Sequence, residues 1–336
     1  MSKFPRKLFW LFSKSKINHK VFNSDKERNN LSSNETLNFQ EPPTQEKTRN
    51  SMFSKKVKTY VYLIIVVFFL ALLLRTFFVE AFRIPTGSME NTLIPGDFIL
   101  VNKSAYSIYV PRYLPIFGLK LKRETLFHIG KPKINDVIVF RFPGSYPNRY
   151  LFNSYLVKRV VGLPGDVVQI INKEVFVDGK RIYPPQTALI DTTNFMLKSQ
   201  KEEGIFPNYE NWNRDNYGPI TVPKKGLTVK LNNKNIQRWK FFIDREIGKN
   251  AVSVSGKIIN INGRPVKKYV FKKNYYFVLG DNRDNSLDSR FWGFVPENYI
   301  IGKAELIYFS WKGNHGKGVS DFFSSPRYNR ILKFVN

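Results

Sequence analysis

Three short stretches of the sequence carry side chains that could together form an activated nucleophile. The first, "FRIPTGSMENTLIPGDFIL" (residues 82–100), has the composition of a tight turn with Ser88 near its centre. A serine hydroxyl becomes a useful nucleophile only when a base removes its proton. The rest of the sequence must therefore supply that base.

Histidine is the usual base, but the chain has three histidines in unsuitable settings, His19, His128 and His315. The first precedes a long apolar run, the second lies in an irregular insertion, and the third lies in the Gly/Lys-rich stretch "KGNHGKG". A Ser-His-Asp triad and a His-rich zinc site are therefore both disfavoured. The chain has no cysteine, which excludes disulfides, cysteine metal ligands and cysteine nucleophiles. We predict neither a metal nor a cofactor.

A lysine held neutral is the alternative base. In "YLVKRVVGLPGD" (155–166), alternation along a strand places Lys158 on the same face as Leu156 and Val160. Burial would lower its pKa, and a drop of roughly two units costs about 2.7 kcal/mol in the charged form. On spacing alone, the favoured interpretation is an ordinary strand lysine whose ammonium reaches water.

The third stretch, "GDNRDNSLDSRFWGFVP" (280–296), concentrates charged and polar side chains after an expected strand. Asp281, Asp284 and Asp288 could supply the oxygen ligands of a calcium site. The interleaved Arg283 and Arg290 would compete for those carboxylates. A buried Asp–Arg network that holds the loop rigid is therefore the better interpretation.

A long apolar run precedes the serine. Thr59 to Val79 would span about 31 Å as a helix, close to the hydrocarbon thickness of a bilayer. The run is too long and too far from Met1 for a cleaved signal peptide, and a buried core helix seldom runs this long without a polar face. Lysines at 55, 56 and 58 precede it, which predicts a cytoplasmic N-terminus and a catalytic domain outside.

Beyond the span the pattern is that of an antiparallel β protein. The runs "DFILVNK", "DVIVFRF", "SYLVKRVVG" and "NYYFVLG" have the β-branched and aromatic content of strands. Residues 167–182 and 254–266 each end in a hairpin signal, Asp-Gly and Asn-Gly respectively. No long helix is expected after residue 80, and residues 104–133 form a first irregular insertion.

We therefore expect a mainly β, antiparallel catalytic domain with an inserted second β-rich region and one N-terminal membrane helix. The expected boundaries are a disordered cytoplasmic tail over 1–54, the membrane helix over 55–80, a catalytic core over 81–182 and 251–312, an insertion or cap over 183–250, and a basic C-terminal tail over 313–336.

The charge of the chain is strongly positive, with 54 Lys and Arg against 26 Asp and Glu and a net charge of +28. Such a balance suits nucleic acid or an anionic membrane surface. The lysines are scattered rather than gathered into a stripe, and no nucleic-acid-binding module is visible. We expect no nucleic-acid partner.

The four segments "FRIPTGSMENTLIPGDFILVNK", "INDVIVFRFP", "YLVKRVVGLPGDVV" and "GDNRDNSLDSRFWGFVP", in this order after one span, closely resemble bacterial type I signal peptidase. That family consists of membrane-anchored serine proteases that remove signal peptides from exported proteins. The resemblance implies a Ser/Lys dyad, a peptide-bond hydrolysis through an acyl-enzyme, and cleavage after small residues of the Ala-x-Ala type.

The resemblance also implies a role for each matched position. Ser88 would be the nucleophile, Lys158 the general base and Ser286 the residue that orients the lysine amine. The Ser88 backbone N–H and the Thr86 hydroxyl would form the oxyanion hole. The supporting residues would be Asp288 and Arg290, as a salt bridge, with Gly280 and Asp281 shaping the loop. Arg159 matches the motif without a derivable role, and we suspect Ile84, Pro85, Val139 and Phe140 of lining the substrate pockets.

The partners implied are signal-peptide-bearing preproteins, the lipid bilayer and the secretion machinery, with the enzyme a monomer. It would be a single-pass protein of the inner (plasma) membrane with its catalytic domain on the outer, periplasmic side. Two alternatives stay open. One is a catalytically inactive or specialised membrane-tethered homologue, and the other is a self-cleaving LexA-type protein, which would need a DNA-binding helix-turn-helix in place of the span.

Overall fold

A computed structural model describes residues 45–110, 121, 125–144, 154–248, 250–312 and 326–335. Contacts divide the chain into two compact units, residues 1–60 and 61–336. The predicted disordered tail lies outside the described residues as far as residue 44, and the predicted C-terminal tail does so between 313 and 325.

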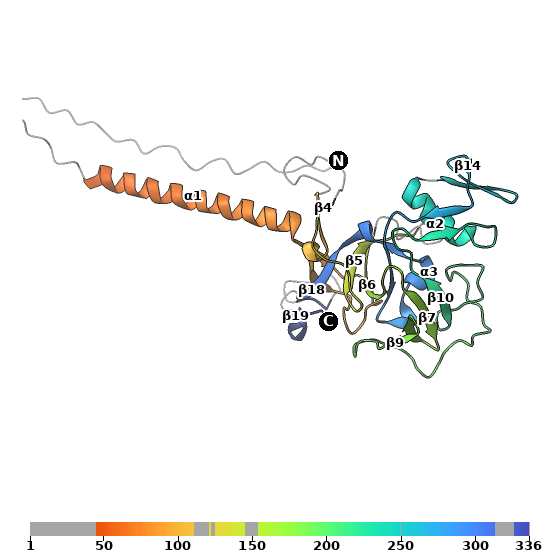
Figure 1. The fold of residues 1–336 in the computed structure, drawn as a ribbon. Coiled ribbons are helices and arrows are strands. Elements are labelled where there is room, and N and C mark those ends of the chain that lie inside the picture. The colour runs from red at the N-terminus through yellow and green to blue at the C-terminus, as the bar shows by residue number, and fades with distance from the viewer. Residues whose placement is uncertain are drawn as a thin grey trace, which may run out of the picture. The chain divides into compact units, whose positions relative to one another are not determined.

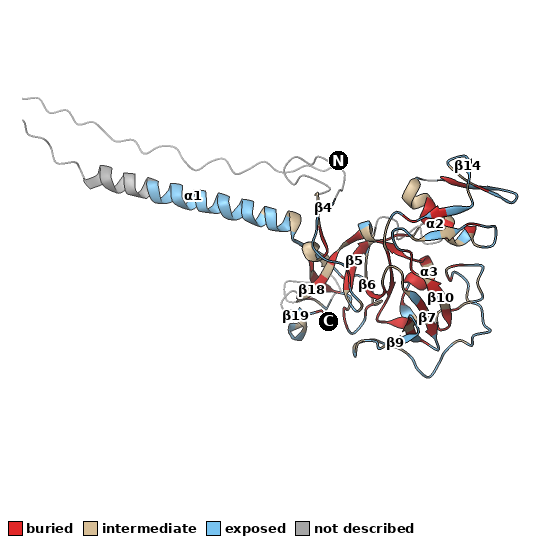
Figure 2. Ribbon diagram, in the orientation of Figure 1, coloured by how far each residue is buried: buried red, intermediate tan, exposed pale blue. Residues whose placement is uncertain are grey.

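The first described element is the helix α1 (Gln45–Phe77). It begins before the predicted residue 55, and it ends three residues before the predicted residue 80 because Val79 and Glu80 already pair in a strand. Its segment Lys55–Phe77, 23 residues, is long and apolar enough to cross a membrane. Figure 2 shows this segment exposed along most of its length, as a helix without protein neighbours would be.

An eight-stranded antiparallel sheet carries Lys158 on β6 and Ser88 in the loop that joins β1 to β2. In spatial order it runs β1 (Val79–Arg83), β2 (Asp97–Asn102), β18 (Ile300–Ser310), β5 (Val137–Arg141), β6 (Tyr155–Gly162), β16 (Tyr275–Leu279) and β17 (Val295–Pro296), with β19 (Lys333–Phe334) also paired to β18. Figure 1 shows β18, β5 and β6 side by side. The four predicted strands are confirmed as β2, β5, β6 and β16.

The other strands of the described residues belong to smaller sheets. They are β10 (Tyr217–Thr221), β7 (Val167–Ile171), β8 (Glu174–Val177) and β9 (Lys180–Ile182) in one sheet; β12 (Val252–Ser255), β13 (Ile258–Ile261) and β14 (Arg264–Pro265) in another; β11 (Thr228–Lys230) with β15 (Lys268–Val270); and β3 (Ser107–Tyr109) with β4 (Thr125–His128). Both predicted hairpins are present, because β8–β9 and β13–β14 pair across their two-residue turns. The protein is mainly β, as predicted.

Two further helices interrupt the β structure, α2 (Ile236–Ile247) and α3 (Ser289–Trp292). The first lies inside the stretch expected to be β-rich, and it packs Trp239, Phe242 and Ile243 into the core. In addition, β10 of the expected insertion pairs with β7 of the expected core. Strand pairing therefore links the two parts that composition separated, and the domain division stays a prediction.

Three apolar clusters fix the sheet. One of them, here called the loop cluster, contains Ile84, Met89, Leu93, Val139 and nine neighbours packed with them, which are Ile99, Val101, Val137, Ala304, Ile307, Val335, Phe82, Val157 and Ile301. A second cluster lies on the opposite face of β5 and includes Phe140, Phe142 and Trp292. Neighbouring strand residues point to opposite faces, so Val139 and Phe140 pack in different clusters.

Candidate active site

The serine stretch forms a closed loop between β1 and β2. Its base is fastened by two backbone hydrogen bonds, from Ile84 N to Asp97 O at 2.8 Å and from Gly96 N to Ile84 O at 2.9 Å. Met89 and Leu93, 2% and 0% exposed, anchor the loop in the loop cluster. The half-buried Ser88 precedes the first of these anchors, so its position is set by the core.

Lys158 on β6 meets this serine. Its Nζ donates a hydrogen bond of 2.5 Å to Ser88 Oγ and one of 3.1 Å to Val157 O. The side chain is 3% exposed, and that burial lowers its pKa from the ordinary 10.5 to about 8. Asp288 and Asp281 oppose this shift, and Arg290 adds to it. Of the two interpretations of the strand lysine, the structure therefore shows the buried one.

The third stretch holds a salt bridge that the sequence predicted. Asp288, which is fully buried, accepts two hydrogen bonds of 2.8 Å from the Arg290 guanidinium, one on each carboxylate oxygen. It also accepts from Gly280 N at 3.1 Å. The guanidinium holds the pKa of the Asp288 carboxyl below its usual range against the effect of burial, so this carboxylate stays ionised.

Asp281 forms a second buried pair, and its partner is Arg159. Arg159 Nε and Nη2 donate to the two Asp281 oxygens at 2.8 and 2.7 Å. The same guanidinium donates to Asn135 O at 2.7 Å, and Thr92 Oγ1 donates to Asp281 Oδ2 at 2.5 Å. Arg159, whose role could not be derived from the sequence, thus connects β6, the strand of Lys158, to Asp281 in the third stretch and to Asn135 before β5.

The carboxylates considered as calcium ligands are each held by a different cation. Asp281 pairs with Arg159, Asp288 with Arg290, and Asp284 with Lys173 at 2.6 Å. Arg283, 5% exposed, has a lowered pKa of about 10, which follows from burial. The loop is therefore a network of ion pairs, as the interleaved charges suggested.

Gly280 sits where no side chain would fit. An added Cβ would lie 2.2 Å from Ser286 Oγ and 2.5 Å from Ser88 O, both closer than real Cβ contacts. The glycine therefore allows the third stretch to pack directly on the peptide of the candidate nucleophile. The close packing gives a physical reason for the presence of glycine at position 280 of the motif.

Ser286 occupies the site without the contact predicted for it. Its Oγ is buried beside the Gly280 backbone, and it forms no hydrogen bond with any described residue. Lys158 Nζ is instead directed to Ser88 Oγ and to Val157 O. The predicted Ser286–Lys158 hydrogen bond is thus absent from this structure, because the amine points to the nucleophile and to its own strand.

The remaining predicted residues lie around the loop. Thr86 is exposed two positions before Ser88, on the solvent side of the loop. Of the suspected pocket residues, Ile84 and Val139 share the loop cluster, whereas Phe140 packs on the other face of the sheet and Pro85 is exposed. Val139 and Phe140 therefore cannot line one pocket together.

Asn282 is a site residue that the sequence reasoning missed. It contacts Ser88 O through its backbone and Gly87 O through its side chain. The Asn-rich composition of "GDNRDNS" was visible, but two asparagines share this stretch, and spacing does not say which of them reaches the serine loop.

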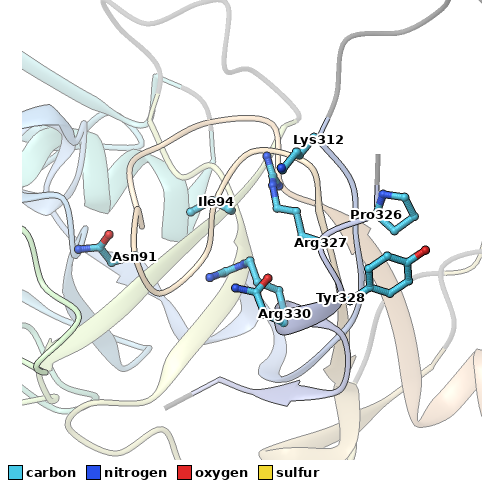
Figure 3. Close-up of a pocket in the computed structure, with 8 residues that line it drawn as sticks. Asn91, Ile94, Lys312, Pro326, Arg327, Tyr328 and Arg330 are labelled. Carbon is cyan, nitrogen blue, oxygen red and sulfur yellow. The ribbon is translucent and has the colours of Figure 1, made fainter. Parts of the chain in front are cut away.

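The base of the serine loop is held from the far end of the chain. Arg330 Nη2 donates to Asp97 Oδ2 at 2.6 Å and to Thr92 O at 3.0 Å, and Asp97 is 0% exposed. Figure 3 shows Arg327 and Arg330 lining a pocket with Asn91 and Ile94 of the loop. The strand β19 secures this segment to β18.

Comparison with known proteins agrees with the motifs. A family model described as "Signal peptidase, peptidase S26" matches residues 57–311. Signal peptidase I of Buchnera aphidicola subsp. Acyrthosiphon pisum is 29% identical over 96% of this chain and 93% of its own. Signal peptidase I of Pseudomonas aeruginosa is 35% identical over 73% of this chain and 70% of its own. A crystal structure of a signal peptidase I from Enterococcus faecalis aligns with 52% of this chain and 97% of its own, at 21% identity and a TM-score of 0.24.

Fold, motifs and relatives together define a serine endopeptidase. The chain belongs to the signal peptidase family, peptidase S26, and the resemblance predicted from its four segments is confirmed.

Proposed function

We propose that this chain is a membrane-anchored signal peptidase I that removes signal peptides from exported preproteins, with Ser88 as nucleophile and Lys158 as general base. The observation that carries the proposal is the 2.5 Å contact between Lys158 Nζ and Ser88 Oγ at a buried amine. Its lowered pKa, about 8, makes the neutral base accessible near neutral pH.

The chemistry begins with neutral Lys158, in which the hydrogen bond runs from the Ser88 hydroxyl to Nζ. As Ser88 Oγ bonds to the scissile carbonyl carbon, its proton moves to Nζ. Lys158 then gives this proton to the leaving amine, the C–N bond breaks, and an acyl-enzyme remains. A water that loses its proton to Lys158 attacks the acyl carbon, and the proton returns to Ser88 Oγ as the signal peptide leaves.

Negative charge on the carbonyl oxygen would be met by the Ser88 N–H and the Thr86 hydroxyl. A preorganised donor of this kind contributes roughly 3 kcal/mol in other acyl-transfer enzymes. The exposed position of Thr86, next to the turn, suits a hydroxyl that faces substrate rather than core.

An extended substrate would pair with β1. Among the described strands this one pairs on one side, with β2, and lies at the edge of the sheet. Phe82 of β1 contacts Tyr155 at the start of β6, with ring centroids 5.2 Å apart. Main-chain pairing at such an edge would fix the substrate, and shallow apolar pockets beside it would receive the small side chains at −1 and −3.

Membrane anchoring would fall to Lys55–Phe77 of α1, about 34 Å long at a helical rise. The lysines at the N-terminal end of this segment, at 55, 56 and 58, favour a cytoplasmic N-terminus and hence cleavage at the outer surface, where signal peptides emerge. The preprotein, the bilayer and the secretion machinery are then the partners, and the enzyme acts as a monomer.

Cleavage of a preprotein with an Ala-x-Ala site by the full chain in detergent tests the proposal. We expect the cut after the second alanine, and loss of cleavage in both Ser88→Ala and Lys158→Met. Retained cleavage in both variants would refute the dyad, and absence of cleavage by the unaltered chain would favour the inactive homologue. Ser104→Ala, a serine away from this site, serves as the matched control.

A further inference from the structure

Asn282 makes three contacts with the turn that carries Ser88. Its backbone N donates to Ser88 O at 3.2 Å. Its side-chain Nδ2 donates to Gly87 O and to Glu90 Oε2, each at 3.1 Å. Both side-chain partners are acceptors, which fixes the NH₂ group on this side of the amide. The residue is 9% exposed, so it lies within the protein rather than on its surface.

The contact with Gly87 O also acts on the neighbouring Ser88 N–H. These two groups belong to one planar peptide unit, in which a trans C=O and N–H point in opposite directions. Holding the Gly87 carbonyl therefore fixes the direction of the Ser88 N–H. That N–H is the backbone donor of the proposed oxyanion hole. The Asn282 backbone contact fixes the next peptide plane through Ser88 O.

The backbone on both sides of Asn282 is held by hydrogen bonds with Leu189, a residue of the stretch expected to be an insertion. Leu189 N donates to Asp281 O at 2.8 Å, and Arg283 N donates to Leu189 O at 2.9 Å. These bonds flank Asn282 and form a parallel bridge between Leu189 and Asn282. The amide is therefore presented from a backbone with little freedom to shift, which is the condition for a precise donor.

We propose that Asn282 is a positioning residue that aims the Ser88 backbone N–H at the substrate oxyanion by holding the Gly87–Ser88 peptide. This inference rests on the proposed function, because it needs Ser88 to be the nucleophile. It predicts a specific kinetic signature. A misdirected oxyanion donor weakens binding of the transition state and leaves ground-state binding of the substrate unchanged, so kcat falls and KM does not rise.

Two pairs of variants test the proposal with the full chain in detergent and an Ala-x-Ala peptide substrate. Asn282→Leu removes the amide at similar size, and Asn282→Asp replaces the donor by an acceptor. Asn285→Leu and Asn285→Asp are the matched controls, because Asn285 is an exposed asparagine of the same turn. The folded fraction of each variant is measured by circular dichroism, so that kcat refers to folded protein only.

We expect kcat to fall roughly 10- to 100-fold in both Asn282 variants, with KM within twofold of the unaltered chain, because losing a whole oxyanion donor costs about 10²- to 10³-fold. Both Asn285 variants should stay within about twofold in kcat. If Asn282→Leu yields no folded sites, the nearly isosteric Asn282→Asp decides.

Two results would overturn the inference. One is an unchanged kcat in the Asn282 variants, and the other is a rise in KM that accounts for the whole loss, since that would place Asn282 in substrate binding. Ser88→Ala is measured alongside. Cleavage that survives in Ser88→Ala refutes the proposed function itself, whereas a dead Ser88→Ala beside fully active Asn282 variants refutes only the role of Asn282.

Discussion

The pH dependence of cleavage follows from the burial of one amine. Lys158 acts as a base only when it is neutral, and its pKa lies at about 8 instead of 10.5. At pH 7 about one molecule in eleven then carries the neutral amine, against about one in three thousand for an ordinary lysine. The difference, 10.5 minus 8, corresponds to about 300-fold in the reactive population.

We therefore expect kcat/KM to rise about tenfold per pH unit up to about pH 8 and to level off above it, because kcat/KM reports ionisations of the free enzyme. Cleavage of an Ala-x-Ala peptide by the full chain would be measured from pH 5.5 to 10 at constant ionic strength. The melting temperature at each pH serves as control, since unfolding would lower the rate for another reason. A rate that still rises tenfold per unit at pH 10 would refute the reasoning from burial.

Three further predictions concern single residues. Lys158→Met should raise the free energy of unfolding by about 3 kcal/mol at pH 7, because 2.5 pKa units oppose the charged form at a 3% exposed site. The pKa of Lys158 is lower in the folded than in the unfolded chain, so the increase in the free energy of unfolding is full below pH 8 and fades toward pH 10.5. Urea denaturation at pH 7 and at pH 10 measures this increase. An equal increase at both pH values would contradict the prediction. Gly280→Ala should lower kcat roughly 100-fold, because the added Cβ would lie 2.5 Å from Ser88 O and displace Ser88. Steady-state kinetics equal to those of the unaltered chain would contradict the inference that no side chain fits at position 280. Arg330→Gln should lower the free energy of unfolding by about 3 kcal/mol, because it leaves the buried Asp97 without its cation. Adding Asp97→Asn should recover part of this loss in the same urea denaturation. A loss below about 1 kcal/mol in Arg330→Gln would show that the ion pair is dispensable.

The sequence predicted the catalytic strands because their side chains obey local rules. The runs that became β5 and β16 are bounded by Asp, Gly or Asn and rich in β-branched or aromatic residues. The central strand β18 was not recognised. Gly302, Lys303 and Glu305 break its alternation, and its pairing with β2 and β5 contains register shifts. Long-range pairing rather than local preference made this segment a strand.

The site divides in the same way. Ser88 and Lys158 were identified from the segments that resemble the family, because the need for a base did not by itself single out Lys158 among the many lysines of this chain. The roles of Arg159 and Asn282 could not be found, because each depends on a partner 122 and 195 positions away. The helix α2 lay hidden for a related reason. Its N-cap, Asn235, makes no side-chain capping bond, and Trp239 and Phe242 suit strands as well as helices.

The ion pair between Arg330 and Asp97 has a consequence for the order of events during synthesis. Ser88 leaves the ribosome 242 residues before Arg330, and β19 is later still. Until residue 330 has been added, the carboxylate at the base of the serine loop lacks its cation, and β18 lacks its pairing with β19. A nascent chain therefore carries Ser88 for most of its elongation without the complete support of that loop. The ion pair can therefore hold the base of the serine loop only in a chain that has been translated as far as Arg330.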